Sequence, residues 1–319
     1  MISASSRGLR IVFAGTPEFG LACLDAMWHS MHKVVAVYTQ PDKPTGRGQM
    51  VQFSAVKQWG LEHQLPVYQP PHFKAQSTID ELTSLKPDLI VVIAYGLILP
   101  EAVLKIAPLG CINVHASLLP RWRGASPIQQ VILHGDEMTG VSIMKMDAGL
   151  DTGPVLTQVS LHVAYDETAG SLHDKLAVLA VKPLLATLDN WLIHQIELSP
   201  QDDQQATYAP KINKEDAHIH WKLPASIIDR QIRAYSPWPI ARTYGRGERI
   251  RIHQAHVLQG DSHATPGTVL SIDKEGMVVA TKQDKLCIDR VQFAGGKVMS
   301  VADWFHGGRA QSLIHLILE

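Results

Sequence analysis

Four short apolar runs in the first 115 residues constrain the fold most strongly. They occupy residues 10–14, 34–38, 89–94 and 112–115, are rich in Val and Ile, and show no regular alternation with polar residues. Runs of this kind predict strands that are buried on both faces, as in a parallel sheet. A helical pattern follows the first run at 17–31, beginning with residues that suit a first helical turn. Strands that alternate with helices predict a Rossmann-like α/β domain with a mostly parallel sheet.

The end of this domain is expected to contain a hairpin and a helix. Residues 140–146 and 154–161 alternate in polarity and are joined by a Gly-rich segment, which predicts two antiparallel strands at one edge of the sheet. Residues 168–193, rich in Ala and Leu, predict one long helix. The polar stretch 194–212 follows without a steady period and is interpreted as a surface linker. The first domain is therefore predicted to cover residues 1–193.

Residues 213–319 predict a second, smaller domain. One helical pattern is at 226–235, and short strands separated by Gly and Asp turns fill most of the remainder. The tail 303–319 is compatible with a final apolar strand or a helix. Several short strands with one helix predict a small β-barrel of the oligonucleotide-binding (OB) type. Residues 208–319 contain 15 Lys and Arg against 11 Asp and Glu, whereas residues 1–207 contain 14 against 19. This mildly basic balance is compatible with a polyanionic partner but does not identify one.

Composition predicts an ordinary soluble protein in a reducing compartment. A chain of 319 residues suits two domains, and 45% apolar with 18% charged residues is typical of a globular fold. Cys23, Cys111 and Cys287 are scattered and odd in number, so neither a disulfide framework nor a zinc cluster is predicted. The longest apolar segment, 89–99, is too short to cross a bilayer. We therefore expect a cytoplasmic protein without a membrane partner.

The candidate chemistry lies at the end of the run 112–115. Successive side chains of a strand point to opposite faces, so Asn113 and His115 share one face. They are also at the carboxyl end of the strand, where open α/β sheets bind ligands. An amide donor beside an imidazole suits acyl transfer, because both groups can donate to a developing oxyanion. A buried, structurally satisfied His is the simpler alternative for such a pair taken alone.

Two longer motifs favour the catalytic interpretation. The segment 113–124, "NVHASLLPRWRG", resembles the signature of the folate-dependent formyltransferases, and 146–153, "MDAGLDTG", is similar to their second signature. The resemblance continues through five further ordered segments, from "RIVFAGTPEFG" to "IRAYSPWP", and so covers nearly the whole chain. Matched residue by residue, it implies that Asn113, His115 and Asp151 are the catalytic residues. The second motif alone would be compatible with a simple turn, because Asp-x-Gly favours tight turns.

The resemblance also implies the co-substrate and the roles of these residues. The formyl donor would be 10-formyltetrahydrofolate, bound against a segment that consists of Ser117, Leu118, Leu119 and Pro120. Asn113 and a cationic His115 would donate to the oxyanion, while Asp151 would stabilise the cation and help to relay the proton through water. This mechanism requires Asp151 to lie within about 10 Å of the His115 ring, the reach of one bridging water.

A further stretch, 94–100, follows the end of another predicted strand. It contains Leu97, Ile98 and Leu99, which either form a wall of the folate pocket or begin a helix.

The acceptor must be inferred outside the catalytic residues, because the family includes enzymes that formylate glycinamide ribonucleotide or amino sugars and others that hydrolyse formylfolate. The loop 40–53 contains Lys43 and Arg47, which could contact the end of a nucleic acid, although a solvated loop is the alternative. The second domain could bind the phosphates of an acceptor arm. Together with these two features, the resemblance implies formyl transfer to the α-amino group of methionyl initiator tRNA. Gln49 and Met50 replace residues expected to be basic in many members, which weakens the predicted electrostatic attraction between this loop and the tRNA.

Other functions have weaker support. The segment 14–20, "AGTPEFG", lacks both G-x-G-x-x-G and G-K-[ST], so a nucleotide-binding module is disfavoured. His218 and His220 share a strand face but have no third ligand nearby in the sequence, and we predict no metal. We expect a monomer.

Overall fold

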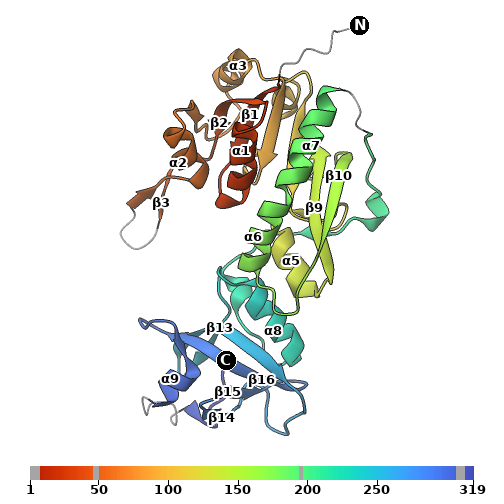
Figure 1. Ribbon diagram of the computed structural model, residues 1–319. Helices are drawn as coiled ribbons and strands as arrows, with labels where there is room; N and C mark the ends of the chain where they lie inside the picture. The colour runs from red at the N-terminus through yellow and green to blue at the C-terminus, as the bar shows by residue number, and fades with distance from the viewer. Residues whose placement is uncertain (1–7, 46–49, 194–196, 307–312) are drawn as a thin grey trace. The chain divides into compact units, whose positions relative to one another are not determined.

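The structure is a computed structural model that describes residues 8–45, 50–193, 197–306 and 313–319 (Figure 1). The described residues divide into two compact units. The first comprises those within 1–127, 138–162 and 173–209, and the second those within 128–137, 163–172 and 210–319. The stretch 197–209, which the sequence suggested was part of a linker, thus lies with the first unit.

The first unit is built on a seven-stranded sheet with the strand order β10-β9-β7-β6-β1-β2-β5. The five strands from β7 to β5 are parallel, while β9 and β10 are antiparallel additions at one edge. The strands are β1 (Arg10–Gly15), β2 (Lys33–Tyr38), β5 (Val67–Tyr68), β6 (Leu89–Ile93), β7 (Cys111–His115), β9 (Met138–Lys145) and β10 (Val155–His162). All five residues of β6 are buried, as expected of a central parallel strand. The predicted Rossmann-like sheet and its edge hairpin are therefore confirmed.

Helices lie between these strands and after the last of them, although residues 128–134 of α5 and 169–172 of α6 belong to the second unit. They are α1 (Leu21–Trp28), α2 (Ala55–Glu62), α3 (Gln76–Ser84), α4 (Glu101–Leu104), α5 (Pro127–His134), α6 (Ala169–Leu179) and α7 (Val181–Leu192), with short 3₁₀ turns η1 (Glu18–Gly20) and η2 (Asp203–Gln205). Figure 1 shows α1 next to α7, and the two helices are in contact. Two small ladders complete the unit: β3 (Lys43–Thr45) with antiparallel β4 (Met50–Gln52), and β8 (Arg123–Gly124) with parallel β11 (Tyr208–Ala209).

The helix predicted over 168–193 is divided into α6 and α7 at Ala180. The cause is Pro183, which lacks an N–H group and so cannot donate to the carbonyl four residues earlier, in the last turn of α6. A proline is tolerated in the first turn of a helix, and a new helix therefore begins just before it.

The second unit is an antiparallel sheet with the order β12-β13-β16-β15-β14, to which β17 is added beside β16. Its elements are η3 (Glu215–Ala217), α8 (Ala225–Ala234), β12 (Arg242–Gly245), β13 (Glu248–Leu258), β14 (Val269–Asp273), β15 (Gly276–Ala280), β16 (Lys285–Phe293), β17 (Met299–Ser300) and α9 (Val301–His306). Ile228 and Ile232 of α8 are buried in the same apolar core as Ile250 and Ile252 of β13.

The last residues of the chain close this sheet into a barrel. Glu319 exchanges two backbone hydrogen bonds with Tyr244 of β12, each 2.9 Å long. His315 and Leu316 bond to Val269 of β14 at 2.9 and 2.8 Å, and the Leu318 N–H donates to Gly267. Both edge strands are therefore paired by one segment, which confirms the predicted β-barrel.

Candidate functional site

Strand β7 places Asn113 and His115 at the carboxyl edge of the parallel sheet. The Asn113 side chain is half-buried and His115 is 6% exposed, while Ile112 and Val114 are buried on the other face. β7 lies between β6 and β9, and His115 is directly opposite Ser142 of β9. The backbone of Asn113 is thus paired with a strand on each side and that of His115 with β9, so the positions of both polar groups are restrained.

The loop after β9 brings Asp151 to the same place. Its Oδ2 is 3.6 Å from His115 Nδ1, and its Oδ1 accepts a hydrogen bond of 3.3 Å from Asn113 Nδ2. The Gly124 N–H also donates to Oδ2, at 2.8 Å. The structure therefore brings together the three side chains that the motifs indicated, from segments almost 40 residues apart.

The two nitrogens of His115 have different surroundings. Nε2 is 2.8 Å from the backbone carbonyl of Trp122, which can only accept a hydrogen bond, so Nε2 carries a hydrogen. Nδ1 then faces Asp151. The nitrogen available for proton transfer or for donation to an oxyanion is therefore Nδ1, within reach of the carboxylate.

The loop 146–153 is folded by its own polar residues. Asp147 Oδ1 accepts hydrogen bonds from the Gly149 N–H at 3.0 Å and from Thr152 Oγ1 at 2.7 Å. A Cβ at Gly153 would lie 1.8 Å from the Lys145 carbonyl oxygen, so this close approach requires glycine. Asp151 itself has a φ of +54°, in the left-handed region that Asp enters more readily than most residues.

Sequence reasoning missed two residues that surround this loop. Gln201 Nε2 donates to the backbone carbonyls of Asp151 and Gly153, and Gln201 Oε1 accepts from Arg123 Nε at 2.9 Å. Arg123 is only 2% exposed. Arg123 lies within the first motif, but no local pattern predicts burial of an arginine or its pairing with a residue 78 positions later.

The segment expected to contact folate follows β7 directly. Ser117 is fully buried and its Oγ donates to the Arg121 carbonyl at 2.6 Å, so this hydroxyl stabilises the turn. The Leu119 N–H donates to Ser142 Oγ at 2.9 Å, and Leu119 is buried, whereas Leu118 and Pro120 are half-buried. Leu118 and Pro120 thus keep some exposed apolar surface, and Ser117 and Leu119 fix the path of the segment.

The stretch 94–100 follows β6, the parallel neighbour of β7, and precedes α4. Leu99 is buried and Leu97 is half-buried, but Ile98 is 91% exposed. Both Thr16 Oγ1 and Gln40 Nε2 donate to the Tyr95 carbonyl at 3.0 Å. The ends of β1, β2 and β6 are thereby joined, so this stretch is at the same sheet edge as the site.

The two expected tRNA contacts differ in what the structure describes. Lys43 is exposed at the start of β3, and its Nζ donates to Gln40 Oε1 at 3.1 Å. Through Gln40 it is linked to the carboxyl edge of the sheet. Arg47 lies outside the described residues.

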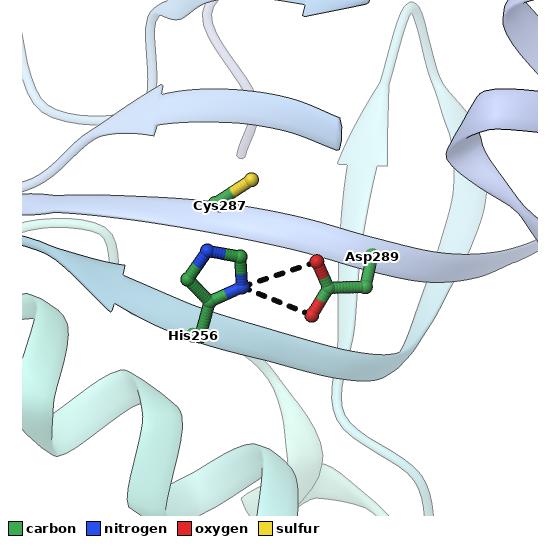
Figure 2. Close-up of side chains that lie close together, drawn as sticks. All are labelled: His256, Cys287 and Asp289. Carbon is green, nitrogen blue, oxygen red and sulfur yellow. Dashed lines mark hydrogen bonds and ion pairs between the residues drawn. The ribbon is translucent and has the colours of Figure 1, made fainter. Parts of the chain in front are cut away.

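Three side chains of types that can bind a metal lie close together elsewhere, on the barrel. Figure 2 shows His256 of β13 beside Cys287 and Asp289 of β16, with ligand atoms within 4.8 Å of one another. His256 Nδ1 already pairs with the Asp289 carboxylate at 3.1 Å. Burial and the nearby carboxylates, Asp289 first among them, raise the pKa of Cys287 to about 11, so at neutral pH its sulfur is a thiol rather than the thiolate that binds metals. We interpret this cluster as an ion pair beside a buried thiol.

No helix within the described residues has the length and apolar character that a membrane span requires.

Comparisons with known proteins show the family to which the chain belongs. The family model described as "Formyl transferase" matches residues 9–188, and that described as "Formyl transferase, C-terminal domain" matches residues 211–309. A methionyl-tRNA formyltransferase of Legionella pneumophila (strain Philadelphia 1) is 56% identical over 98% of this chain and 99% of its own length. One from Pseudomonas fluorescens is 48% identical over 97% of each chain.

Solved structures share the fold. An N-formyltransferase from Helicobacter canadensis, crystallised with folinic acid and dTDP-3-aminofucose, matches 88% of this chain and 98% of its own with a TM-score of 0.67 at 16% identity. A methionyl-tRNA formyltransferase from Clostridium thermocellum matches 78% of this chain and 94% of its own, with a TM-score of 0.54 at 18% identity. On the family models and the near full-length relatives, the chain belongs to the formyltransferase family, among the methionyl-tRNA formyltransferases.

Proposed function

We propose that this protein transfers the formyl group of 10-formyltetrahydrofolate to the α-amino group of methionyl initiator tRNA for translation initiation. The observation that supports this proposal best is the convergence of Asn113, His115 and Asp151 at the carboxyl edge of the sheet, with contacts of 3.3 and 3.6 Å. An amide, an imidazole and a carboxylate in contact can stabilise an oxyanion and move a proton, which are the two requirements of acyl transfer to an amine.

In the proposed reaction, the neutral amine attacks the formyl carbon and the carbonyl oxygen becomes an oxyanion. One hydrogen of Asn113 Nδ2 is directed to Asp151, and the other can donate to this oxyanion. His115 donates to this oxyanion from Nδ1 once that nitrogen has taken up a proton, because its Nε2–H is bonded to the Trp122 carbonyl. Both donors are fixed on β7 before substrate binds, so little reorganisation is needed in the transition state.

Collapse of the intermediate breaks the bond between the formyl carbon and the folate nitrogen. The amine must lose a proton and the folate nitrogen must gain one. The His115–Asp151 pair lies where it can pass this proton, directly or through water, because the carboxylate stabilises the imidazolium formed on the way. The net change is one formyl group and one proton exchanged between two nitrogens, so no oxidant is required and no metal enters the proposal.

The donor and acceptor would approach from different elements. The folate would lie against the apolar surface of Leu118, Pro120 and Leu97, and the tRNA end would reach the loop that contains Lys43 and Arg47. In the barrel, Arg242 and Arg251 are direct cross-strand partners, and Arg249 follows on the same face of β13. Like charges opposite each other repel, and a phosphate between them would relieve that repulsion. This supports binding of an acceptor arm by the second unit.

The proposal is tested by offering several acceptors to the purified protein with 10-formyltetrahydrofolate. The acceptors are methionyl-tRNA, free methionine, an amino-sugar nucleotide and glycinamide ribonucleotide. Formylation of methionyl-tRNA alone is expected; preferential formylation of the amino sugar or the ribonucleotide would assign a different acceptor. Thermal unfolding with and without folinic acid tests donor binding separately, since a ligand stabilises only the folded state that binds it.

The proposal includes a monomeric, cytoplasmic enzyme. Size-exclusion chromatography with light scattering across a concentration series tests the first of these expectations.

A further inference from the structure

We propose that Gln201 is a positioning residue for Asp151, and that the buried Arg123 holds Gln201 in its working orientation. This inference rests on the proposed function, because it assigns the catalytic carboxylate its geometry. Gln201 comes from the polar stretch after α7, and its hydrogen bonds go to Asp151, Gly153 and Arg123. Its effect on the reaction must therefore pass through the loop 146–153.

Both the nitrogen and the oxygen of the Gln201 side-chain amide are hydrogen-bonded. Its Nε2 donates at 2.8 Å to the Asp151 carbonyl and at 2.7 Å to the Gly153 carbonyl, and its Oε1 accepts from Arg123 Nε at 2.9 Å. A flipped amide would place an oxygen against two carbonyl oxygens and an NH₂ group against a guanidinium. The hydrogen bonds therefore define a single orientation.

Arg123 is itself fixed from several directions. Its Nη2 pairs with Asp203 at 2.8 Å, and its backbone N–H donates to the Thr207 carbonyl at 2.9 Å. The arginine is almost completely removed from solvent, so its hydrogen bonds to Gln201 and Asp203 replace those that water would supply. The buried arginine thus connects the turn after β7 to the segment 199–209 through hydrogen bonds.

The turn that contains Arg123 also contacts the proposed catalytic residues on either side. The Trp122 carbonyl accepts from His115 Nε2, and the Gly124 N–H donates to the Asp151 carboxylate. The carboxylate of Asp151 is therefore held by Gly124 and its backbone carbonyl by Gln201. Asp151 has a φ of +54°, a conformation that persists when the surroundings restrain it.

The test uses the full-length protein and compares Gln201→Ala, Gln201→Glu and Gln204→Ala. The Glu variant keeps an acceptor for Arg123 but loses the donors to both carbonyls, and Gln204 is an exposed glutamine of the same segment that serves as the control. We expect both Gln201 variants to lower kcat about 10- to 100-fold, because a displacement of about 1 Å at a reacting group has effects of this size. KM for the formyl donor is expected to change less than about twofold, and Gln204→Ala should resemble the wild type.

A double-mutant cycle with Asp151→Asn separates positioning from a general loss of structure. If Gln201 acts through Asp151, adding Gln201→Ala to Asp151→Asn should lower kcat by less than about twofold more. Multiplication of the two single effects, or a Gln201→Ala variant with wild-type kcat, overturns the inference.

Hydrogen exchange gives a readout that does not depend on activity. Backbone amides of 146–153 should exchange faster in Gln201→Ala and at the wild-type rate in Gln204→Ala. Unchanged exchange in this loop rejects the positioning role. Failure of the wild type to formylate methionyl-tRNA rejects only the proposed function.

Discussion

Replacing Asp151 with Asn removes one charge from the centre of the site and little else. The side chains have the same shape, and Asn accepts the left-handed backbone conformation that Asp151 adopts at φ +54°. An amide oxygen can still accept the hydrogen bond from the Gly124 N–H. The loop should therefore keep its position, while the imidazole of His115 loses the anion 3.6 Å from its Nδ1.

The size of the effect follows from Coulomb's law. Two unit charges about 4 Å apart interact by about 4 kcal/mol at an effective dielectric constant of about 20. The pair is largely shielded from water, with side-chain exposures of 6% for His115 and 14% for Asp151, so screening by solvent is limited. The interaction is strongest when the imidazole is cationic, in the transition state. At about 1.4 kcal/mol per tenfold in rate, we expect kcat to fall about 100- to 1,000-fold.

The assay is steady-state formylation of methionyl-tRNA, followed by acid gel electrophoresis of the product. Asp147→Asn is the matched control, since Asp147 is an exposed carboxylate of the same loop that bonds to Gly149 and Thr152. It should change kcat by no more than a few fold. A kcat for Asp151→Asn within about threefold of the wild type would show that the carboxylate charge takes no part in catalysis.

Four further predictions concern other residues of the chain. Asn113→Ala should lower kcat about 100- to 1,000-fold by removing an oxyanion donor, with thermal unfolding unchanged, and near-wild-type activity would exclude it from the mechanism. Arg47→Ala should raise KM for tRNA and leave folate affinity unchanged; a loss of folate affinity would give the loop another role. The thiols should react slowly with a disulfide reagent at neutral pH, since burial raises their pKa values, and rapid labelling before unfolding would contradict this for Cys23, Cys111 and Cys287. Burial lowers the pKa of His32, whose Nδ1 accepts a hydrogen bond from the Leu9 N–H. Below about pH 6.5 the unfolded chain therefore binds more protons at this residue than the folded protein does, and the free energy of unfolding falls as the pH falls. The drop in the urea midpoint between about pH 7.5 and about pH 5.5 should be smaller in His32→Gln, and equal drops would refute that assignment.

The sheet could be predicted from the sequence because its strands are locally marked. Leu89–Ile93 and Cys111–His115 are apolar runs with burial on both faces, a pattern that is typical of the inner strands of a parallel sheet. The barrel was predicted from strand spacing, but its closure was not. The pairing of Glu319 with Tyr244 joins residues 75 apart along the chain through backbone groups, which have no side-chain signature.

The proposed catalytic side chains were also predictable, because each occurs in a motif whose chemistry is distinctive. The tautomer of His115 was not, since it depends on the Trp122 carbonyl rather than on a side chain. Gln201 was hidden for a different reason. Its segment has the polar, aperiodic composition of a linker. Such a composition indicates that a stretch lacks regular structure, but not whether its polar atoms form hydrogen bonds with the rest of the protein.

The energetics of Asp151 explain why such a segment is needed. A residue in a sparsely populated backbone region costs about 1–3 kcal/mol, and a hydrogen bond contributes about 1 kcal/mol net. The two bonds to the carboxylate, from Asn113 and Gly124, would leave the upper part of that range uncompensated. Together with the two bonds from Gln201 to the loop carbonyls they are of the size required, so the strained conformation becomes the stable one. The loop 146–153 is therefore specified jointly by its own glycines and by the segment after α7, which implies that changes near Gln201 will affect the proposed catalytic site although they lie outside both motifs.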